Sequence, residues 1–163
     1  MSGFAKIKAD VVKAIPREEK FREDIEEVLG VELRKDIRQQ KKKATPIDMD
    51  PIDYMMFDKG SSLIKAYIEI KVRPKYKSTS IPTAMIDHRK MVAFQLKSLT
   101  THLPVYYAVR WNDRDLVYEF NPAHKFPIEH GGRTKNTRSE YDIKEVQYIP
   151  MNYFRELKKE ILK

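Results

Sequence analysis

The chain has 163 residues, of which 41% are hydrophobic and 34% are charged, and its 32 Lys and Arg against 24 Asp and Glu give a net charge of +8. This length suits one domain over residues 1–163, and the positive charge favours a polyanionic partner. The lack of cysteine excludes disulfides, thiolate zinc sites and cysteine nucleophiles, and no apolar run is long enough to span a bilayer.

The N-terminal segment contains no apolar core of a secretory signal, so we expect a cytoplasmic protein. Residues 1–15 are mixed in character and predict an N-terminal arm or a short helix. Pro16 suits the first turn of a helix that we expect over residues 17–29, and Gly30 suits its end. The apolar positions of this helix recur on one stripe, at Phe21, Ile25, Val28 and Leu29.

Residues 31–43 predict a strand or a mixed segment, and residues 54–57 and 63–72 predict a β-hairpin around the turn Asp58-Lys59-Gly60. The second strand of this hairpin has the clearest pattern in the chain, because apolar and polar residues alternate at period two. Its apolar side is Ile64, Ala66, Ile68, Ile70 and Val72, and its other side is Lys65, Tyr67, Glu69 and Lys71.

The remaining pattern predicts a basic loop over residues 73–82, a helix over residues 84–99 and a strand over residues 105–111. A strand, a helix and a strand in this order favour a crossover to a parallel neighbour. We place the buried face of the helix at Met85, Val92, Leu96 and Leu99. Residues 115–120 suggest an edge strand, residues 121–140 a long loop, and the end of the chain a strand, a proline break and a short helix, so that residues 121–163 form an addition to the core.

The charged side chains of the strongest strand suggest a chemical site. Glu69 and Lys71 lie two residues apart and therefore project from one face of the sheet. Asp53 opens the preceding hairpin strand, so normal pairing brings it close to Glu69. Two convergent carboxylates, with the backbone carbonyl of Ile70 as a third ligand, suit Mg²⁺ or Mn²⁺. Lys71 could then orient a metal-bound water or offset charge on a phosphate.

Pro51-Ile52-Asp53 followed by Glu69-Ile70-Lys71 resembles the motif of the PD-(D/E)XK nuclease superfamily, which includes restriction enzymes, Holliday junction resolvases and many phage endonucleases. One extra residue, Ile52, separates the proline from the aspartate. The resemblance implies a restriction-endonuclease-like α/β core with a central mixed sheet flanked by helices in the order α-β-β-β-α-β. It also implies a Mg²⁺-dependent deoxyribonuclease that leaves 5′-phosphate ends, with Mn²⁺ able to substitute.

The resemblance implies further site residues on two helices. The family often places an acid on its first helix, and Glu18 lies on the inward stripe whereas Glu19 should face solvent. The family also often has a polar residue on the helix after the acid-X-lysine strand, and here Gln95 is the candidate, with His88 near the same face. Glu18 could equally be an acid that complements the helix dipole, and Gln95 an ordinary flanking residue.

Segments of the chain are also similar to small phage-encoded members, namely MIDHRKMVAFQ, VYYAVR and HGGR. A phage protein would act in the host cytoplasm. A basic rim for DNA phosphates is predicted at Lys41, Lys42, Lys43, Lys75, Lys77, Arg133, Lys135 and Arg138, and these could alternatively be solvated loop charges. Tyr76, Tyr106 and Tyr107 could stack on bases or pack within a sheet.

Several alternatives remain open from the residues alone. Glu69 and Lys71 could be the solvated face of an antiparallel sheet, and Asp48 or Asp50 could replace Asp53 as the metal ligand. On the same fold, the protein could bind DNA or a protein partner without catalysis. No phosphate-binding loop and no serine-nucleophile motif is present, and no histidine pair has zinc spacing, so that His130 is not expected to be a ligand. A homodimer would favour cutting of DNA junctions.

Overall fold

The computed structural model describes residues 3–35, 52–132 and 143–162, and describes residues 3–14 by their backbone alone. The elements are α1 (Gly3–Leu29), β1 (Val31–Lys35), β2 (Tyr54–Asp58), β3 (Ile64–Arg73), β4 (Thr83–Asp87), α2 (His88–Thr101), β5 (Val105–Trp111), β6 (Asp115–Glu119), β7 (Ile128–Gly132), β8 (Ile143–Pro150), η3 (Met151–Tyr153), β9 (Arg155–Glu156) and η4 (Lys159–Leu162). Asp48, Asp50 and Pro51 lie outside the described residues.

Helix α1 is longer than the sequence predicted. It begins at Gly3, so residues 3–15 extend the helix and do not form a loose arm, and Pro16 lies inside it. Proline removes one backbone hydrogen bond but does not by itself end a helix. Phe21, Ile25 and Leu29 of the predicted stripe are buried, whereas Val28 is 42% exposed. Gly30 ends the helix with a φ of +67°, which glycine adopts without strain.

The central sheet has the mixed topology expected from the sequence. Among the described residues it contains six strands in the order β1-β2-β3-β5-β6-β9. The β2–β3 hairpin is antiparallel, as predicted, and β5 pairs with β3 in parallel after the crossover through α2. The remaining neighbours in this sheet are antiparallel.

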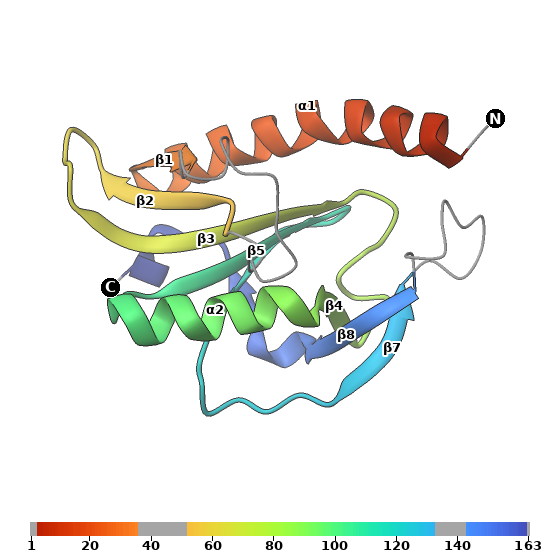
Figure 1. The fold of residues 1–163 in the computed structure, drawn as a ribbon. Coiled ribbons are helices and arrows are strands. Elements are labelled where there is room, and N and C mark those ends of the chain that lie inside the picture. Colours follow the sequence, from red (N-terminus) through yellow and green to blue (C-terminus); the bar gives the residue numbers. More distant parts are fainter. Residues whose placement is uncertain (1–2, 36–51, 133–142, 163) are drawn as a thin grey trace.

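Apolar side chains cover the two faces of the central sheet with different elements. Helix α1 packs on one face, where Phe21 and Ile25 meet Ile68 and Ile70 of β3. Helix α2 packs on the other face, where Phe94 meets Tyr107 of β5. Figure 1 shows this arrangement, with α1 and α2 on opposite sides of β3 and β5. Strand β3 is therefore held firmly between two layers, which fixes any side chain that projects from it.

A second, three-stranded sheet in the order β4-β8-β7 corrects two sequence predictions. The helix predicted over residues 84–99 begins only at His88, because residues 83–87 pair with β8 as strand β4. The buried face of α2 is consequently Met91, Ala93 and Phe94, while Leu96 and Leu99 are 42% and 55% exposed.

The C-terminal part of the chain is also more structured than the sequence predicted. Strand β7 lies inside the stretch expected to be a loop over residues 121–140, and residues 133–142 lie outside the described part. The predicted strand before Pro150 is present as β8, but the expected terminal helix is replaced by η3, β9 and η4. No helix among the described residues is long and apolar enough to cross a membrane.

Candidate active site

The site lies where β3 extends beyond its partner β2. Strand β2 starts at Tyr54, which pairs with Ile68, and β3 continues to Arg73. On its other side this extension pairs with β5, where Glu69 lies opposite Tyr107. Within the described residues no strand covers Glu69–Arg73 on the β2 side. We call this stretch the open edge of β3.

Asp53 and Glu69 are locked together at the start of the open edge. The backbone N–H of Asp53 donates to Oε2 of Glu69 at 3.1 Å, and the backbone N–H of Ile70 donates to Oδ2 of Asp53 at 3.1 Å. Side-chain oxygens thus accept backbone N–H groups at the point where the β2–β3 ladder stops. This confirms the predicted approach of Asp53 to Glu69 and fixes both carboxylates against rigid backbone.

Burial disfavours the charged form of both carboxyl groups in this pair. Burial, and after it the neighbouring charge of Asp53, raises the pKa of Glu69 to about 7. Burial also raises the pKa of Asp53. The hydrogen bond from the N–H of Ile70 and the positive charge of Lys90 lower this pKa but do not offset the effect of burial. Two buried carboxyl groups that resist ionising together are a favourable place for a cation.

The donor set fits a hard divalent ion of the Mg²⁺ type. Asp53 and Glu69 supply carboxylate oxygens, and Ile70, the third predicted ligand through its carbonyl, donates its N–H to Asp53 beside them. The described residues contain no cluster of three or more His, Asp or Glu side chains that could hold a metal ion alone. Mg²⁺ does not require such a cluster, because it usually binds through one or two carboxylates together with water and substrate phosphate.

Lys71 and Glu18 flank the carboxylate pair. Lys71 follows on β3 and is exposed at the open edge, and its pKa is lowered by partial desolvation first and by Arg73 next. Glu18 reaches the site from α1, where burial raises its pKa and the charges of Lys71 and Asp53 act on it. The structure therefore brings Glu18, Asp53, Glu69, Ile70 and Lys71 into one electrostatic group.

Lys90 belongs to the site although the sequence analysis missed it. Its Nζ lies 3.0 Å from Oε1 and 3.2 Å from Oε2 of Glu69. Lys90 is in the first turn of α2, beside the buried Met91. The sequence feature that could have revealed Lys90 is Asp87, which caps α2 by accepting the N–H of Arg89. A helix starting after Asp87 places Lys90 next to the buried face formed by Met91 and Phe94.

The structure does not place Gln95 at the site. Gln95 is exposed on α2, whose buried face is formed by Met91, Ala93 and Phe94. His88 instead contacts Oε1 of the buried Gln147 through Nδ1 at 3.0 Å, and His130 is exposed on β7. Neither histidine reaches the carboxylate pair.

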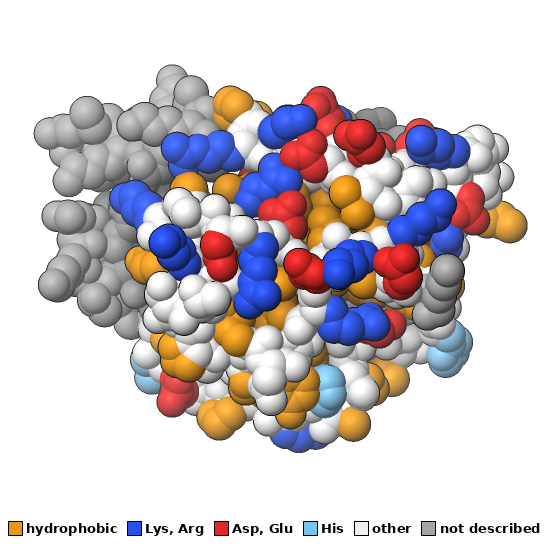
Figure 2. Space-filling model, turned by 180° about the vertical axis from the view of Figure 1, so that it is seen from behind, with side chains coloured by type: hydrophobic (Ala, Val, Ile, Leu, Met, Phe, Trp, Pro, Cys, Tyr) orange, Lys and Arg blue, Asp and Glu red, His pale blue; other side chains and the backbone are white. Residues whose placement is uncertain are grey.

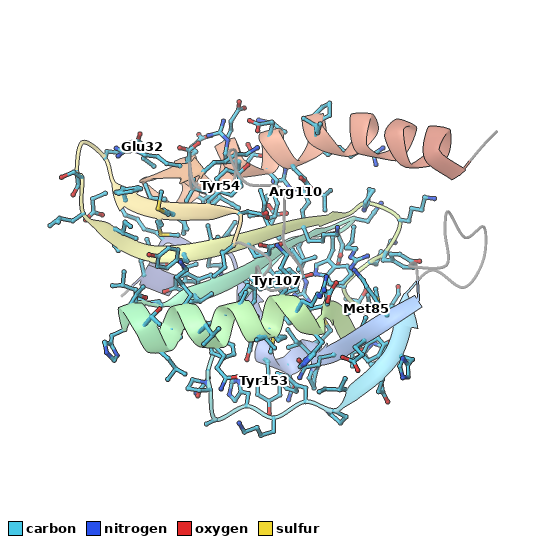
Figure 3. All side chains as sticks on the ribbon, viewed as in Figure 1. Glu32, Tyr54, Met85, Tyr107, Arg110 and Tyr153 are labelled. Atoms are coloured by element: carbon cyan, nitrogen blue, oxygen red, sulfur yellow. The ribbon has the colours of Figure 1, made fainter. Side chains whose placement is uncertain are left out.

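Two of the predicted base-stacking tyrosines are packing residues. Tyr106 and Tyr107 are both 3% exposed, on opposite faces of the central sheet. Burial raises the pKa of Tyr107 to about 12, and its hydroxyl donates to the carbonyl of Met85 at 3.4 Å. Figure 3 shows Tyr107 between the central sheet and α2, and Arg110 on the α1 side. Tyr76 is 52% exposed and remains accessible.

The basic rim is only partly described. Lys75 and Lys77 are exposed in the loop after β3, and the other predicted members lie outside the described residues. Figure 2 shows Lys and Arg side chains interleaved with Asp and Glu on the rear face of the molecule. Many of these charges are paired, as in the ion pairs that Asp24 makes with Lys20 and Arg110.

A shallow cavity of about 450 Å³ lies apart from the carboxylates. Its lining residues come from α1 and from the ends of β3 and β5, and they are Pro16, Arg17, Lys20, Val72, Pro74, Arg110, Trp111 and Asn112. None of the candidate metal ligands lines it. The candidate site at the open edge of β3 is therefore separate from this cavity.

An α-β-β-β-α-β core with Asp53, Glu69 and Lys71 at the open edge defines a nuclease of the PD-(D/E)XK superfamily. The chain belongs to the family described as "Phage putative PDDEXK endonuclease", whose model matches residues 14–157.

A solved structure supports the fold independently. The chain resembles Hjc from Archaeoglobus fulgidus, a Holliday junction resolvase of an archaeal hyperthermophile, with a TM-score of 0.50 and 13% sequence identity. The likeness covers 90% of this chain and 97% of that one. No curated protein sequence matches the chain.

Proposed function

We propose that the protein is a metal-dependent endonuclease that hydrolyses DNA phosphodiester bonds. The observation that carries this proposal is the pair of carboxylates of half-buried Asp53 and buried Glu69, each anchored to backbone N–H groups, beside Lys71. Membership of an endonuclease family supports the same reaction class. The alternative that Glu69 only belongs to the solvated face of a sheet is disfavoured, because Glu69 is 9% exposed.

Asp53, Glu69 and the carbonyl of Ile70 would hold Mg²⁺, or Mn²⁺ in its place. When bound, the ion supplies an activated water and offsets charge on the phosphate. Lys71 would orient that water or balance the charge that develops on the phosphate oxygens. Glu18 would keep the Lys71 ammonium in place through its opposite charge. The cut would leave 5′-phosphate ends.

We propose branched DNA as the preferred substrate, since a solved structure that the fold resembles is a Holliday junction resolvase. A symmetric junction presents two equivalent strands, so a homodimer with two copies of the site would suit it. The phage family supports action in the cytoplasm of a host cell. Lys75 and Lys77, with the predicted rim residues outside the described part, would contact DNA phosphates.

The test compares the wild type with Lys71→Ala on supercoiled plasmid and on a labelled four-way junction, each with Mg²⁺, Mn²⁺ or EDTA. Removing one positioned group of this kind costs about 10²–10³ in rate, so we expect cutting with either metal and a loss of that size in the variant. Lys65→Ala is the matched control, because Lys65 lies on the same strand but pairs with Asp58 at 2.6 Å.

Two outcomes would contradict the proposal. No cutting of either substrate with Mg²⁺ or Mn²⁺, together with DNA binding that persists in EDTA, would favour a binding module on the same fold. A protein that neither binds nor cuts DNA would point to a protein partner. Size-exclusion chromatography with light scattering would test the homodimer separately.

A further inference from the structure

Lys90 is held in place by rigid structure and is not a loose surface side chain. Its neighbour Met91 and, one turn later, Phe94 are buried against the central sheet, and Asp87 caps the start of the helix. The Lys90 side chain is 21% exposed and its partner Glu69 is 11% exposed. The ion pair therefore forms in a partly desolvated place, where charge interactions are stronger than at the surface.

The geometry puts the Lys90 ammonium on the oxygens that a metal ion would need. It lies within 3.2 Å of both Oε1 and Oε2 of Glu69. Oε2 also accepts the N–H of Asp53, so this oxygen already has two donors. A metal ion that approached Glu69 from the side of Lys90 would have to displace the ammonium.

The charges of the site lead to the same conclusion. Glu18, Asp53 and Glu69 carry three negative charges when ionised, and Lys71 and Lys90 carry two positive charges. A divalent ion added to this group would leave one excess positive charge. The group is neutral with the ion in place only when one ammonium has moved away, and Lys90 is the one that contacts a candidate ligand directly.

We propose that Lys90 is a stand-in cation, which holds Glu69 in the metal-free protein and competes with the divalent ion for that carboxylate. Lys90 is then a positioning residue that sets the metal affinity of the site. This inference rests on the proposed function only in assuming that Asp53 and Glu69 bind a divalent ion.

The experiment measures Mn²⁺ binding to DNA-free protein by isothermal titration calorimetry at pH 8.5, where proton competition is small. Lys90→Met keeps an unbranched side chain only one atom shorter and removes the charge. When two groups are energetically coupled at a site, removing one commonly changes the affinity for the other by about fivefold or more. Lys90→Met should therefore bind Mn²⁺ at least about fivefold more tightly than the wild type. Lys90→Arg should stay close to the wild type. Lys97→Met is the control, because it removes the same charge two turns further along α2, over Tyr67.

Tighter binding in Lys90→Met alone supports the inference. Unchanged or weaker binding in Lys90→Met overturns it, because Lys90 would then be a structural partner of Glu69 or a support for the metal. If the wild type binds Mn²⁺ and cuts DNA while Lys90→Met binds it equally well, only this inference fails. If the wild type neither binds the ion nor cuts DNA, the proposed function fails as well. Thermal unfolding of each variant confirms that it is folded.

Discussion

At the residue scale, the site depends on two side chains that accept backbone N–H groups where a strand stops. Oδ2 of Asp53 accepts the N–H of Ile70, and Oε2 of Glu69 accepts the N–H of Asp53. Each carboxylate therefore has a structural partner in the backbone, and Oε1 of Glu69 also lies 3.0 Å from Nζ of Lys90. This arrangement makes the stability of the metal-free protein depend on the charge state of the pair.

The raised pKa of Glu69 predicts how stability changes with pH. The folded value is about 7, above the ordinary value of 4.5, so the fold favours the neutral carboxyl group. The stabilising contribution is complete below the unfolded pKa and is lost as pH rises through the folded pKa. In EDTA, the melting temperature of the wild type should fall more between about pH 5 and pH 8 than that of Glu69→Gln.

Added Mg²⁺ should restore the wild type at the higher pH and leave Glu69→Gln almost unchanged, because a neutral amide is a poor ligand. Glu129→Gln is the control, since Glu129 is exposed on β7. Equal pH dependence in the wild type and Glu69→Gln would show that Glu69 ionises as freely in the folded protein as in the unfolded chain.

Part of the candidate site could be predicted from the sequence because it rests on local pattern. The alternation of β3 places Glu69 and Lys71 on one face, and the hairpin brings Asp53 beside them. Lys90 could not be placed in the same way, since its position depends on where α2 begins. The sequence-based prediction counted Met85 as helical and therefore chose a stripe with Leu96 and Leu99, whereas Met85 belongs to β4 and the buried face of α2 is Met91, Ala93 and Phe94.

At the element scale, the start of α2 is decided by a distant partner. Residues 83–87 contain Ala84, Met85 and Ile86, which suit a helix or a strand. They form β4 because β8 pairs with them, from Thr83 with Pro150 to Asp87 with Val146. No local pattern in the sequence reveals a pairing over this separation, so the helix was predicted too early.

Asp87 therefore has a measurable role in positioning α2. It accepts the N–H of Arg89 at 3.0 Å and forms an ion pair with Lys144 of β8. Loss of a helix cap costs about 0.5–2 kcal/mol, so Asp87→Ala should lower the free energy of unfolding by about that amount. Chemical denaturation measures it.

Asp87→Asn is the matched variant, because asparagine keeps the capping oxygen and loses only the charge. It should retain most of the stability. If Asp87→Asn were as unstable as Asp87→Ala, the ion pair with Lys144 would matter more than the cap.

At the scale of the whole molecule, the net charge of +8 is spread over a surface of mixed sign. Basic side chains such as Lys20 and Arg110 are engaged with acids, so they contribute little to phosphate binding. Lys75 and Lys77 are exposed, and they follow Arg73, the last residue of the open edge, in the sequence. We therefore expect the polyanionic partner predicted from the composition to bind through Lys75 and Lys77, close to the candidate site.

Salt dependence tests this distribution of charge. Each lost phosphate contact lowers the slope of log affinity against log salt by about 1, so Lys75→Ala with Lys77→Ala should lower it by about 2. Fluorescence anisotropy with a labelled duplex in EDTA gives both slopes. Lys158→Ala is the control, since Lys158 pairs with Glu156 at 2.7 Å. An unchanged slope in the double variant would exclude this loop from the DNA interface.

The overall fold class was predictable because the core uses strong periodic patterns in a common order. The mixed central sheet, the parallel β5 and the two flanking helices follow those patterns. The second sheet was missed, since β4 is short and β7 lies in a polar stretch that reads as a loop. Both strands exist because β8 offers its two edges to them.

The open edge of β3 also affects the tendency of the protein to aggregate. An uncovered strand edge is a template on which a strand of another molecule can add, and this is a route to aggregation. Here such a strand would have to displace Asp53 from the N–H of Ile70 and meet the charges of Glu69 and Lys71. The side chains proposed for hydrolysis thus also hinder the addition of another strand. Neutral substitutions at Asp53 and Glu69 would remove negative charges that oppose this addition and would therefore favour aggregation.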